Sequence, residues 1–535
     1  MSQPFGVSCR GGLNTNLNQL EMLAQPGVAR ELVNFEVDSD GGYRRINGFR
    51  LFGGESATRP EANQKILGVI PYNDGIVVCV GTNIYFSEDG ITWLQINRAA
   101  VSGTGDDYAT FTSRAILPRT NQGQSSFVIF EGATFNYGEL IIADGANQPY
   151  SFRMEGTGAI NTRTFFANEI TVDGSNAVKY ITIHDHHLIA AGVQDNLNTI
   201  YYSVYNDPDN FSGVGSGAVT ISDQITGIKG FREDLIVFAE NSIHKLVNIN
   251  DTSNIRTDPI TENVGCLSGY SIQEAGGDLL FLAPDGIRTI AGTVRIGDVE
   301  LSSVSRQIQD IIQNITQSIS SFTISSVVIR NKSQYRLFYT TDTSSSTDSK
   351  GIIGSLTQNG YEWSETKGIQ ALGLFSGFNS EGVEEFYHGD KDGYIYIHDI
   401  GNSFSPAGVD SNIRAVYRTP DFDFGDVGTR KTLKYVRISF SPEGEIQPTL
   451  RVRYDYEDSN IPQPSDYILT SIPLPALFGA AIFNTAVFGG SNDPMVRQTV
   501  EGTGNTCSFK IISDDKNAPY AVNGIYVDYM PAGRR

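Results

Sequence analysis

The sequence predicts an all-β chain in which residues 61–400 form a β-propeller of about seven blades, with six or eight also possible. One motif, made of an apolar run, a polar turn and a second apolar run, recurs across this region. Its copies start at residues 76, 140, 188, 235, 279, 335 and 386, so neighbouring copies lie 44 to 64 residues apart. A repeat near fifty residues with paired strands is typical of propeller blades. One small twisted sheet cannot bury both faces alone, whereas sheets stacked in a ring can.

The composition agrees with many short strands joined by tight turns. The chain has 535 residues, which is too long for one ordinary core, and it is rich in Gly (56), Tyr (25) and Phe (29). There are 39 Lys and Arg residues and 60 Asp and Glu residues, which gives a net charge of −21. Such a surface repels nucleic-acid phosphates, so we expect no grip on DNA, although a duplex can slide past an acidic wall.

The four cysteines predict neither a disulfide framework nor a zinc site, because they form no CxxC pair; they are Cys9, Cys79, Cys266 and Cys507. Cys79 lies in an apolar run, where a thiol serves as a small buried hydrophobic group. The first twelve residues, MSQPFGVSCRGG, lack the basic start and apolar core of a secretory leader, so we expect none. The sequence contains no run of eighteen apolar residues, so we expect no membrane-spanning helix.

Residues 1–60 are expected to form an arm that packs on a platform and takes its core from another domain. The segment has little periodicity before the apolar run 29–35. Asp40-Gly41-Gly42 predicts a turn, and residues 43–52 alternate weakly, as a strand does.

The composition changes near residue 401, after which a linker-like stretch, GNSFSPAGVDSN, is followed by alternating segments. These segments are IRAVYRTPDFDF, LKYVRISFSP, LRVRYDYED, CSFKIISDD and GIYVDYMPAGRR. Alternation interrupted by turn residues predicts an antiparallel sandwich or barrel. Residues 401–535 would therefore form the platform together with the arm.

One helix is expected, over residues 303–316, between the fifth and sixth blades. The apolar residues that fall on one face at helical spacing are Val304, Ile308, Ile311, Ile312 and Ile315. Ser302 or Ser303 can cap its start. A helix inserted here packs on the rim of the propeller or touches a neighbouring subunit. The polar stretch 340–350 predicts a loop at the tip of a hairpin.

Two motifs suggest turns or metal ligands. Residues 87–93, SEDGITW, resemble the Asp-box turn of sialidase-like propellers, shortened by one residue, in which the aspartate caps turn amides and the Trp packs between sheets. We interpret it as a structural hairpin.

The segment His184-Asp185-His186-His187 is rich in histidine. If it forms a strand, His184 and His186 lie on one face, where two histidines can bind a metal. No third ligand is evident, so a polar strand at a blade edge is favoured.

Asp390-Lys391-Asp392-Gly393 has the spacing with which a calcium loop starts, but the terminal Glu of that loop is missing. Asp-Gly pairs occur at 89–90, 144–145, 285–286 and 392–393, and such pairs predict hairpin turns.

The apolar stretch 474–490, LPALFGAAIFNTAVFGG, has three open interpretations: a seam between subunits, part of a core, or a membrane contact.

The sequence predicts no enzyme. It contains no G-x-S-x-G elbow, Walker loop or dinucleotide turn in a strand-to-helix setting. Carboxylates are abundant, but nothing singles out a glycosidase pair. We therefore predict no catalytic, cofactor-binding or metal-binding residues and no cofactor.

Several short motifs follow one another in the arm; they are Gly11-Gly12-Leu13-Asn14, Pro26-Gly27, Leu32-Val33-Asn34, Gly41-Gly42-Tyr43-Arg44-Arg45 and Gly48. Their order resembles the start of the tail nozzle (tail tubular) proteins of short-tailed bacteriophages. That family begins with a Gly-Gly segment, a spacer, an LxN element and a G-x-x-x-R-x-G turn. Residues 203–213, 226–246, 263–272 and 276–290 resemble the propeller core of such proteins, and 424–440 with 497–535 resemble their carboxyl end.

The resemblance implies a structural virion protein that is made in the host cytoplasm and located in the phage tail. Copies of the chain would form a ring, a hexamer in that family, at the distal end of the tail. The expected partners are the chain itself, the adaptor and portal-proximal ring proteins, tail fibres and the host outer surface. Double-stranded DNA would pass through the lumen without specific binding. The alternative is a receptor-recognition propeller that binds or cleaves carbohydrate, as the Asp-box-like turn and the many aromatic residues suggest.

Overall fold

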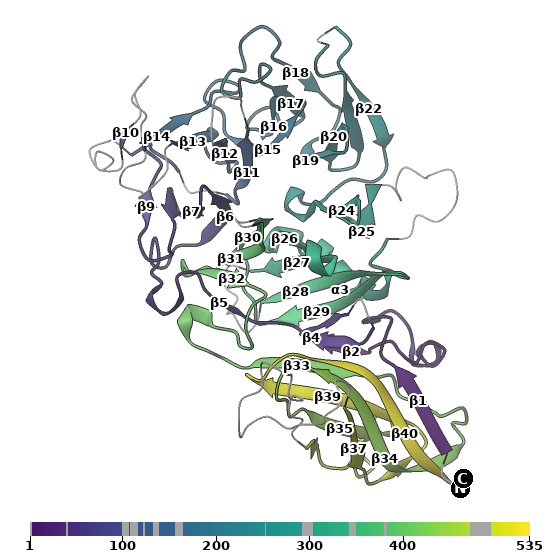
Figure 1. Ribbon diagram of the computed structural model, residues 1–535. Helices are drawn as coiled ribbons and strands as arrows, with labels where there is room; N and C mark the ends of the chain where they lie inside the picture. The colour runs from purple at the N-terminus through teal and green to yellow at the C-terminus, as the bar shows by residue number, and fades with distance from the viewer. Residues whose placement is uncertain are drawn as a thin grey trace.

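The structure is a computed structural model. Six small antiparallel sheets and four strands of a nine-stranded sheet stand around one axis, and the platform strands lie at one end of this ring (Figure 1). The predicted all-β propeller with an additional β platform is therefore confirmed. The structure describes residues 3–38, 41–98, 106–107, 116–120, 123–131, 138–155, 164–251, 253–290, 303–341, 349–378, 382–470 and 494–534.

The first four blades follow the chain, and each has its innermost strand on the propeller axis. Blade one contains β6 (Ile66–Tyr72), β7 (Gly75–Val80), β8 (Asn83–Ser87) and β9 (Leu94–Gln95). Blade two contains β11 (Ser126–Phe130), β12 (Glu139–Ala143), β13 (Tyr150–Glu155), β14 (Thr164–Glu169) and β10 (Asp106–Asp107). Blade three contains β15 (Val178–His184), β16 (His187–Val193), β17 (Thr199–Tyr202) and β18 (Gly217–Thr220). Blade four contains β19 (Ile225–Phe231), β20 (Asp234–Ala239), β21 (Ile243–Val247) and β22 (Arg256–Thr261).

The last three blades complete the ring. Blade five contains β23 (Gln273–Ala275), β24 (Asp278–Ala283) and β25 (Gly286–Thr289). Blade six contains β26 (Thr323–Ile329), β27 (Gln334–Thr340), β28 (Lys350–Thr357) and β29 (Gly360–Lys367). Blade seven contains β30 (Gly373–Phe378), β31 (Glu384–Gly389), β32 (Ile395–His398) and β5 (Phe49–Leu51). Six blades are sheets of their own, and blade six is part of a larger sheet.

The platform is a sandwich of two sheets that enclose a common apolar core. One sheet contains β33 (Ile413–Arg418), β39 (Cys507–Asp515), β35 (Thr449–Tyr454) and β36 (Tyr467–Ile468). The other contains β34 (Thr429–Pro442), β40 (Tyr520–Arg534), β37 (Met495–Thr499), β38 (Thr503–Gly504), β1 (Gln3–Ser8), β3 (Phe35–Val37) and β4 (Tyr43–Arg45). Alternate residues of these strands are buried, for example Val436, Ile438 and Phe440 on β34, as expected for sheets with one face in a core.

A short strand of the arm, β2 (Glu31–Val33), joins the propeller to the platform. Val33 pairs with Glu365 of β29 in parallel and with Val416 of β33 in antiparallel register. Blade six and one platform sheet thereby become a single nine-stranded sheet. The two parts of the chain are consequently continuous through backbone hydrogen bonds (Figure 1).

The arm contributes strands to both parts of the molecule. Strand β1 pairs with β40, and β3 and β4 extend the same platform sheet. Strand β5 pairs antiparallel with β32, with Phe49 opposite His398, and so becomes the fourth strand of blade seven. Residues 49–51 therefore close the propeller ring, although the sequence analysis assigned them to an arm on the platform.

The predicted apolar helix is present, preceded by a 3₁₀ turn. The turn η5 (Arg306–Ile308) leads into α3 (Gln309–Gln317), and Ile308, Ile312 and Ile315 are buried in the core shared with the arm and platform. The expected cap by Ser303 does not form, because the helix begins from the 3₁₀ turn without a side-chain cap. Ser302 lies outside the described residues.

The other helical segments within the described residues are short. They are α1 (Gln19–Met22), capped by the Asn18 side chain, and the 3₁₀ turns η1 (Gly54–Ser56), η4 (Gly269–Ser271), η6 (Ile319–Ser321), η7 (Arg330–Lys332), η8 (Pro406–Gly408) and η9 (Asp455–Glu457). The predicted loop 340–350 joins the paired strands β27 and β28, and residues 342–348 within it lie outside the described residues. The stretch 474–490 also lies outside them.

Candidate functional site

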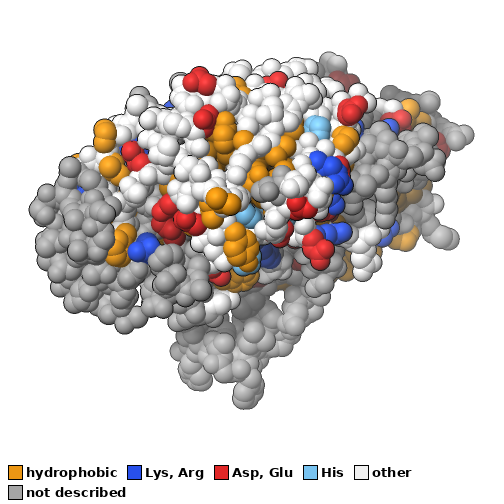
Figure 2. Space-filling view, turned by 90° about the horizontal axis from the view of Figure 1, so that it is seen from above, with side chains coloured by type: hydrophobic (Ala, Val, Ile, Leu, Met, Phe, Trp, Pro, Cys, Tyr) orange, Lys and Arg blue, Asp and Glu red, His pale blue; other side chains and the backbone are white. Residues whose placement is uncertain are grey.

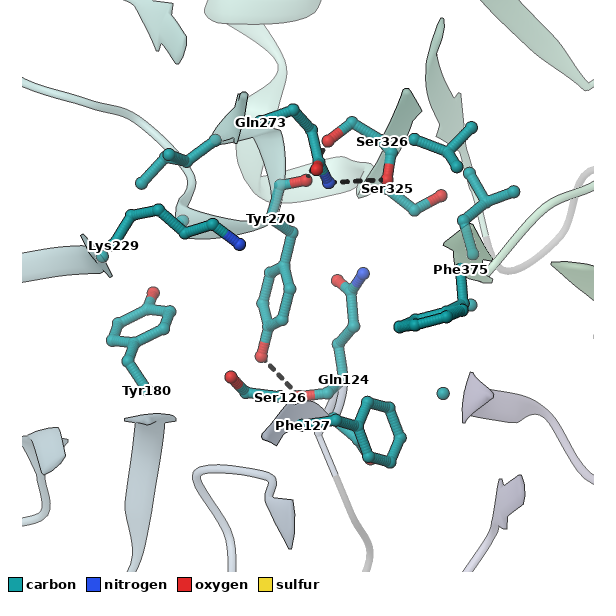
Figure 3. Close-up of a pocket in the computed structure, with 18 of the residues that line it drawn as sticks. Gln124, Ser126, Phe127, Tyr180, Lys229, Tyr270, Gln273, Ser325, Ser326 and Phe375 are labelled. Carbon is teal, nitrogen blue, oxygen red and sulfur yellow. Dashed lines mark hydrogen bonds between the residues drawn. The ribbon is translucent and has the colours of Figure 1, made fainter. Parts of the chain in front are cut away.

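A cavity of about 350 Å³ lies on the propeller axis, where the innermost strands of all seven blades meet. Figure 3 shows Tyr270 standing across this cavity. Its hydroxyl donates to the carbonyl of Gln124, which precedes β11, and its own carbonyl accepts a 2.6 Å hydrogen bond from the Ser326 hydroxyl of β26. Tyr270 thus connects blades two, five and six through the axis, and a second cavity of about 520 Å³ lies beyond it.

The inner strands of neighbouring blades pack closely around the axis. A Cβ placed on Gly373 of β30 would lie 2.9 Å from the Cα of Gly68 on β6, and a Cβ on Gly68 would lie 2.5 Å from the ring of Phe127. Side chains at these two positions would push blades seven, one and two apart. With Tyr270 across the axis, the described residues leave cavities of about 350 and 520 Å³ there, which are far too small for a nucleic-acid duplex.

A second pocket, of about 500 Å³, lies between blades seven and one, and we call it the rim groove. Its aromatic residues are Phe52, Tyr72, Phe378 and Tyr387, and its carboxylates are Asp74, Glu88 and Glu385. The Tyr387 hydroxyl donates to Glu385, and burial together with this hydrogen bond raises the pKa of Tyr387. Phe378 is 58% exposed, so one aromatic ring remains accessible beside carboxylates.

One face of the molecule carries charges of both signs. In Figure 2 acidic and basic side chains lie near one another on the face seen from above, among polar and apolar groups. A nucleic-acid-binding surface is expected to carry mainly basic side chains, and this face does not.

The Asp-box-like turn is a structural hairpin, as predicted. The Oδ1 atom of Asp89 accepts 2.8 Å hydrogen bonds from the amides of Ile91 and Thr92. The indole of Trp93 donates to the carbonyl of Thr58 and packs against the core between blades seven and one. The turn therefore fixes a blade connection.

The histidine cluster differs from the prediction of a continuous strand. Asp185 and His186 have positive φ angles, 47° and 63°, and form the tight turn of the β15–β16 hairpin. His184 therefore pairs with His187 across the hairpin, and His184 and His186 do not share a strand face. His187 is buried with Nδ1 2.6 Å from the Ser203 carbonyl and Nε2 3.0 Å from Asn250, which leaves no nitrogen for a metal.

The Asp390 carboxylate also stabilises a turn. Its Oδ1 accepts from the amides of Asp392 and Tyr394, and its Oδ2 accepts from the Tyr396 hydroxyl at 2.7 Å. Among the described residues, no group of three or more His, Cys, Asp or Glu side chains is placed to hold a metal ion.

The cysteines are buried thiols. Burial raises the pKa of Cys9 and Cys79 to about 12 and that of Cys266 to about 11. Cys507 is likewise buried, with a raised pKa. A thiol that stays protonated at neutral pH is a poor nucleophile, and the prediction of a small buried hydrophobic role for Cys79 is confirmed.

Several arm residues of the nozzle-like pattern lie at the junction of arm, propeller and platform. Asn34 has a left-handed conformation, φ 56°, and is buried. Its Nδ2 donates to the carbonyls of Lys367 and Arg414, and its Oδ1 accepts from the Lys367 amide and the Thr366 hydroxyl, at 2.8 to 3.0 Å. This one side chain therefore satisfies backbone groups of both β29 and β33.

Other residues of the same motifs make equally close contacts. Arg45 is buried and bonds Asp515 and the carbonyl of Asn517. Leu13 donates its amide to the carbonyl of Trp363 on β29 at 2.7 Å. A Cβ on Gly48 would lie 1.8 Å from the Ser403 carbonyl oxygen, so only glycine fits there.

A buried ion network secures the same junction. Glu36 contacts Arg44 at 2.7 Å, Lys332 at 3.0 Å and Arg336 at 2.9 Å, and Asp399 contacts Lys332 at 2.7 Å and Arg336 at 3.1 Å. Burial alone would raise the pKa of Glu36, but the three cations outweigh it and lower the pKa. Breaking a buried pair leaves an uncompensated charge, so the network fixes the positions of arm, blade six and blade seven.

Sequence reasoning missed one carboxylate cluster between blades two and three. Burial, followed by the neighbouring carboxylates Glu139 and Asp207, raises the pKa of Asp209 to about 7, whereas Arg153 acts in the opposite direction. These residues come from separate blades. Only their tertiary pairing brings the like charges together.

No family model matches the chain, and no curated protein matches it. Among solved structures, it is similar to the extracellular domain of a proposed one-component system from B. thetaiotaomicron, with 12% identity and a TM-score of 0.36 over 66% of this chain and 40% of that protein. It is similar to the AfRom2 CNH domain, with 10% identity and a TM-score of 0.33 over 64% and 97% of the two chains. An exo-β-1,3-galactanase from Phanerochaete chrysosporium gives 10% identity and a TM-score of 0.25 over 90% and 99%.

The chain spans 40% of the length of the first of these proteins. At such scores the similarities carry no functional argument, and the fold description rests on the strand pairing itself. In the part of the chain that the structure describes, no helix has the length and apolar character needed to cross a membrane.

Proposed function

We propose that this chain is a structural subunit of a short phage tail, a nozzle that forms a ring of six copies at the distal end. The observation that carries the proposal is the place of the motif residues. Asn34, Arg45 and Gly48, which the chain shares with that family's pattern, hold the arm between propeller and platform. Residues that hold this junction together fit a subunit whose propeller and platform must stay fixed to each other.

Rigidity supports the proposal. The nine-stranded sheet runs from the axis of the propeller into the platform, and the Glu36 network holds the same junction. A tail tube that contains pressurised DNA needs subunits that do not open. The proposed role is mechanical, and it includes no enzymatic step.

The DNA path would run between copies of the chain. The axial cavity of one propeller is crossed by Tyr270 and narrowed by Gly68 and Gly373. The lumen would therefore be formed by the ring, with adaptor and portal-proximal proteins on its capsid side and tail fibres or the host surface as further contacts. A net charge of −21 favours sliding of the duplex over binding.

Immunogold electron microscopy of phage particles that carry this chain tests the location. Label confined to the distal tail axis is the expected result. Label on peripheral fibres, or no label on particles, would contradict the nozzle. In a second measurement, the isolated ring should fail to retain duplex DNA at any salt concentration, and tight salt-sensitive retention would refute the sliding mechanism.

The rim groove favours a second candidate function, recognition of a carbohydrate receptor by the tail. Sugar rings present apolar faces and hydroxyl groups, and the groove offers the exposed Phe378 ring beside Asp74, Glu88 and Glu385. Glycan-array binding that is lost in Phe378→Ala would support this function. The matched control is Val383→Ala, another exposed apolar residue, at 55%, that does not line the groove. Release of reducing sugar that depends on one carboxylate would indicate cleavage.

A further inference from the structure

We propose that the axial cavity binds a small organic anion, a carboxylate attached to a compact ring. The cavity is distinct from the rim groove, and the inference does not depend on the nozzle function. Its first support is charge. The chain has 60 Asp and Glu residues against 39 Lys and Arg residues, yet the described residues that line this cavity include Lys229 and Arg330 and no carboxylate.

Lys229 supplies the positive charge at the cavity. It lies on β19, and Figure 3 shows its amino group directed to the interior beside Tyr270. Arg330, by contrast, is engaged by Glu384 at 3.1 Å and lies near the Ser376 hydroxyl. Within the described residues no carboxylate forms an ion pair with Lys229, and burial lowers its pKa, against a smaller opposing effect of Glu274. An anion in the cavity would give this ammonium group the partner it lacks.

Two neutral groups are placed to bind the same anion. The side-chain amide of Gln124 projects into the middle of the cavity between Tyr270 and Phe375, and the Ser126 hydroxyl lies on the same side as Lys229 (Figure 3). Neither side chain hydrogen-bonds to another side chain or to the backbone in the described part of the protein. An ammonium, an amide N–H and a hydroxyl are the donors that a carboxylate accepts from.

Aromatic walls select the body of the ligand. Phe127, Tyr180, Tyr270 and Phe375 come from four different blades and face the cavity. Flat ring faces pack well against one another. The volume of about 350 Å³ lies at the lower end of the range for small-molecule sites. A single ring with one carboxylate fits these limits, whereas a nucleotide or an oligosaccharide exceeds them.

Calorimetric titration of the full chain with benzoate tests the proposal, with benzamide as the neutral probe of the same shape. Benzoate should bind about tenfold more tightly than benzamide, because one charge-assisted hydrogen bond to Lys229 accounts for such a difference. Lys229→Met keeps the length of the side chain without its charge, and it should remove this preference. Gln124→Leu is a second variant, and it should weaken benzoate binding even if Lys229→Met proves unstable.

Lys179→Met is the matched control. Lys179 is also partly buried and lies over the Tyr180 ring at 5.1 Å, but it lines the cavity on the other side of Tyr270. Its substitution should leave the preference for benzoate unchanged. Equal affinity for benzoate and benzamide, no binding of either probe, or an equal loss in Lys179→Met and Lys229→Met would each overturn the proposal.

Discussion

Two buried histidines should make the protein less stable in mild acid. His398 Nε2 lies 3.0 Å from the Arg336 guanidinium, and His398 Nδ1 lies 3.2 Å from Nδ1 of His388. Burial and then Arg336 and Lys332 lower the pKa of His398, and burial and then His398 lower the pKa of His388. Both rings are therefore neutral in the folded protein at neutral pH.

The size of the effect follows from proton linkage. The unfolded chain takes up a proton at each histidine near pH 6.5, whereas the folded protein does not. The unfolded state then binds more protons, so the free energy of unfolding falls as the pH falls below 6.5. At about pH 5.5 each histidine that stays neutral lowers it by about 1.4 kcal/mol, or about 2.8 kcal/mol for the pair.

Urea unfolding of wild-type protein and of His388→Phe, at about pH 8 and about pH 5.5, measures this contribution. The phenyl ring keeps the packing of His388 against Tyr396 and Phe49 but cannot take up a proton. The acid-induced loss of stability should be about 1.4 kcal/mol smaller in the variant. His186→Gln, at the exposed hairpin turn, should behave as wild type. An equal acid-induced loss in wild type and His388→Phe would refute the reasoning.

Three further outcomes are expected. Asn34→Ala should destabilise the protein by about 3 kcal/mol, because buried partners on β29 and β33 lose their hydrogen bonds; Asn34→Gly, which tolerates the positive φ angle, separates the backbone effect in the same urea titration. Asp89→Ala should lower stability by about 1 kcal/mol through loss of the turn amide contacts while leaving glycan binding unchanged, and a loss of binding would assign the turn a functional role. Asp209→Asn should stabilise the protein relative to wild type at pH 8 and not at pH 4. The raised pKa of Asp209 in the folded protein gives wild type a stability that is lost as the pH rises through about 7. A difference between the two proteins that does not vary with pH would contradict this.

Local patterns predicted the repeating part of the fold well. Apolar runs such as Leu279–Leu282, followed by a turn and a second run, mark each blade, because the period of a strand is visible within a few residues. The same holds for the apolar face of α3 and for the Asp89 turn. The histidine cluster was misread, because the prediction placed Asp185 and His186 in a strand and overlooked their tendency to form a two-residue turn.

The candidate sites were less accessible to sequence reasoning. The axial cavity joins Gln124, Lys229, Tyr270 and Ser326, and no spacing in the sequence relates these residues. The rim groove likewise combines Phe52 of the arm with Glu385 of blade seven. Such sites form only where several blades meet after the propeller ring has closed.

By itself, the sequence determined the strands, their turns and the all-β propeller class, because these depend on interactions between near neighbours. The tertiary structure decided how the chain closes on itself: β5 pairs with β32 at Phe49 and His398, and β2 lies between β29 and β33. These pairings join residues hundreds of positions apart. Their register follows from the fit of buried side chains such as Asn34, Glu36 and Arg336 after the sheets have assembled, and that fit is a property of the packed molecule.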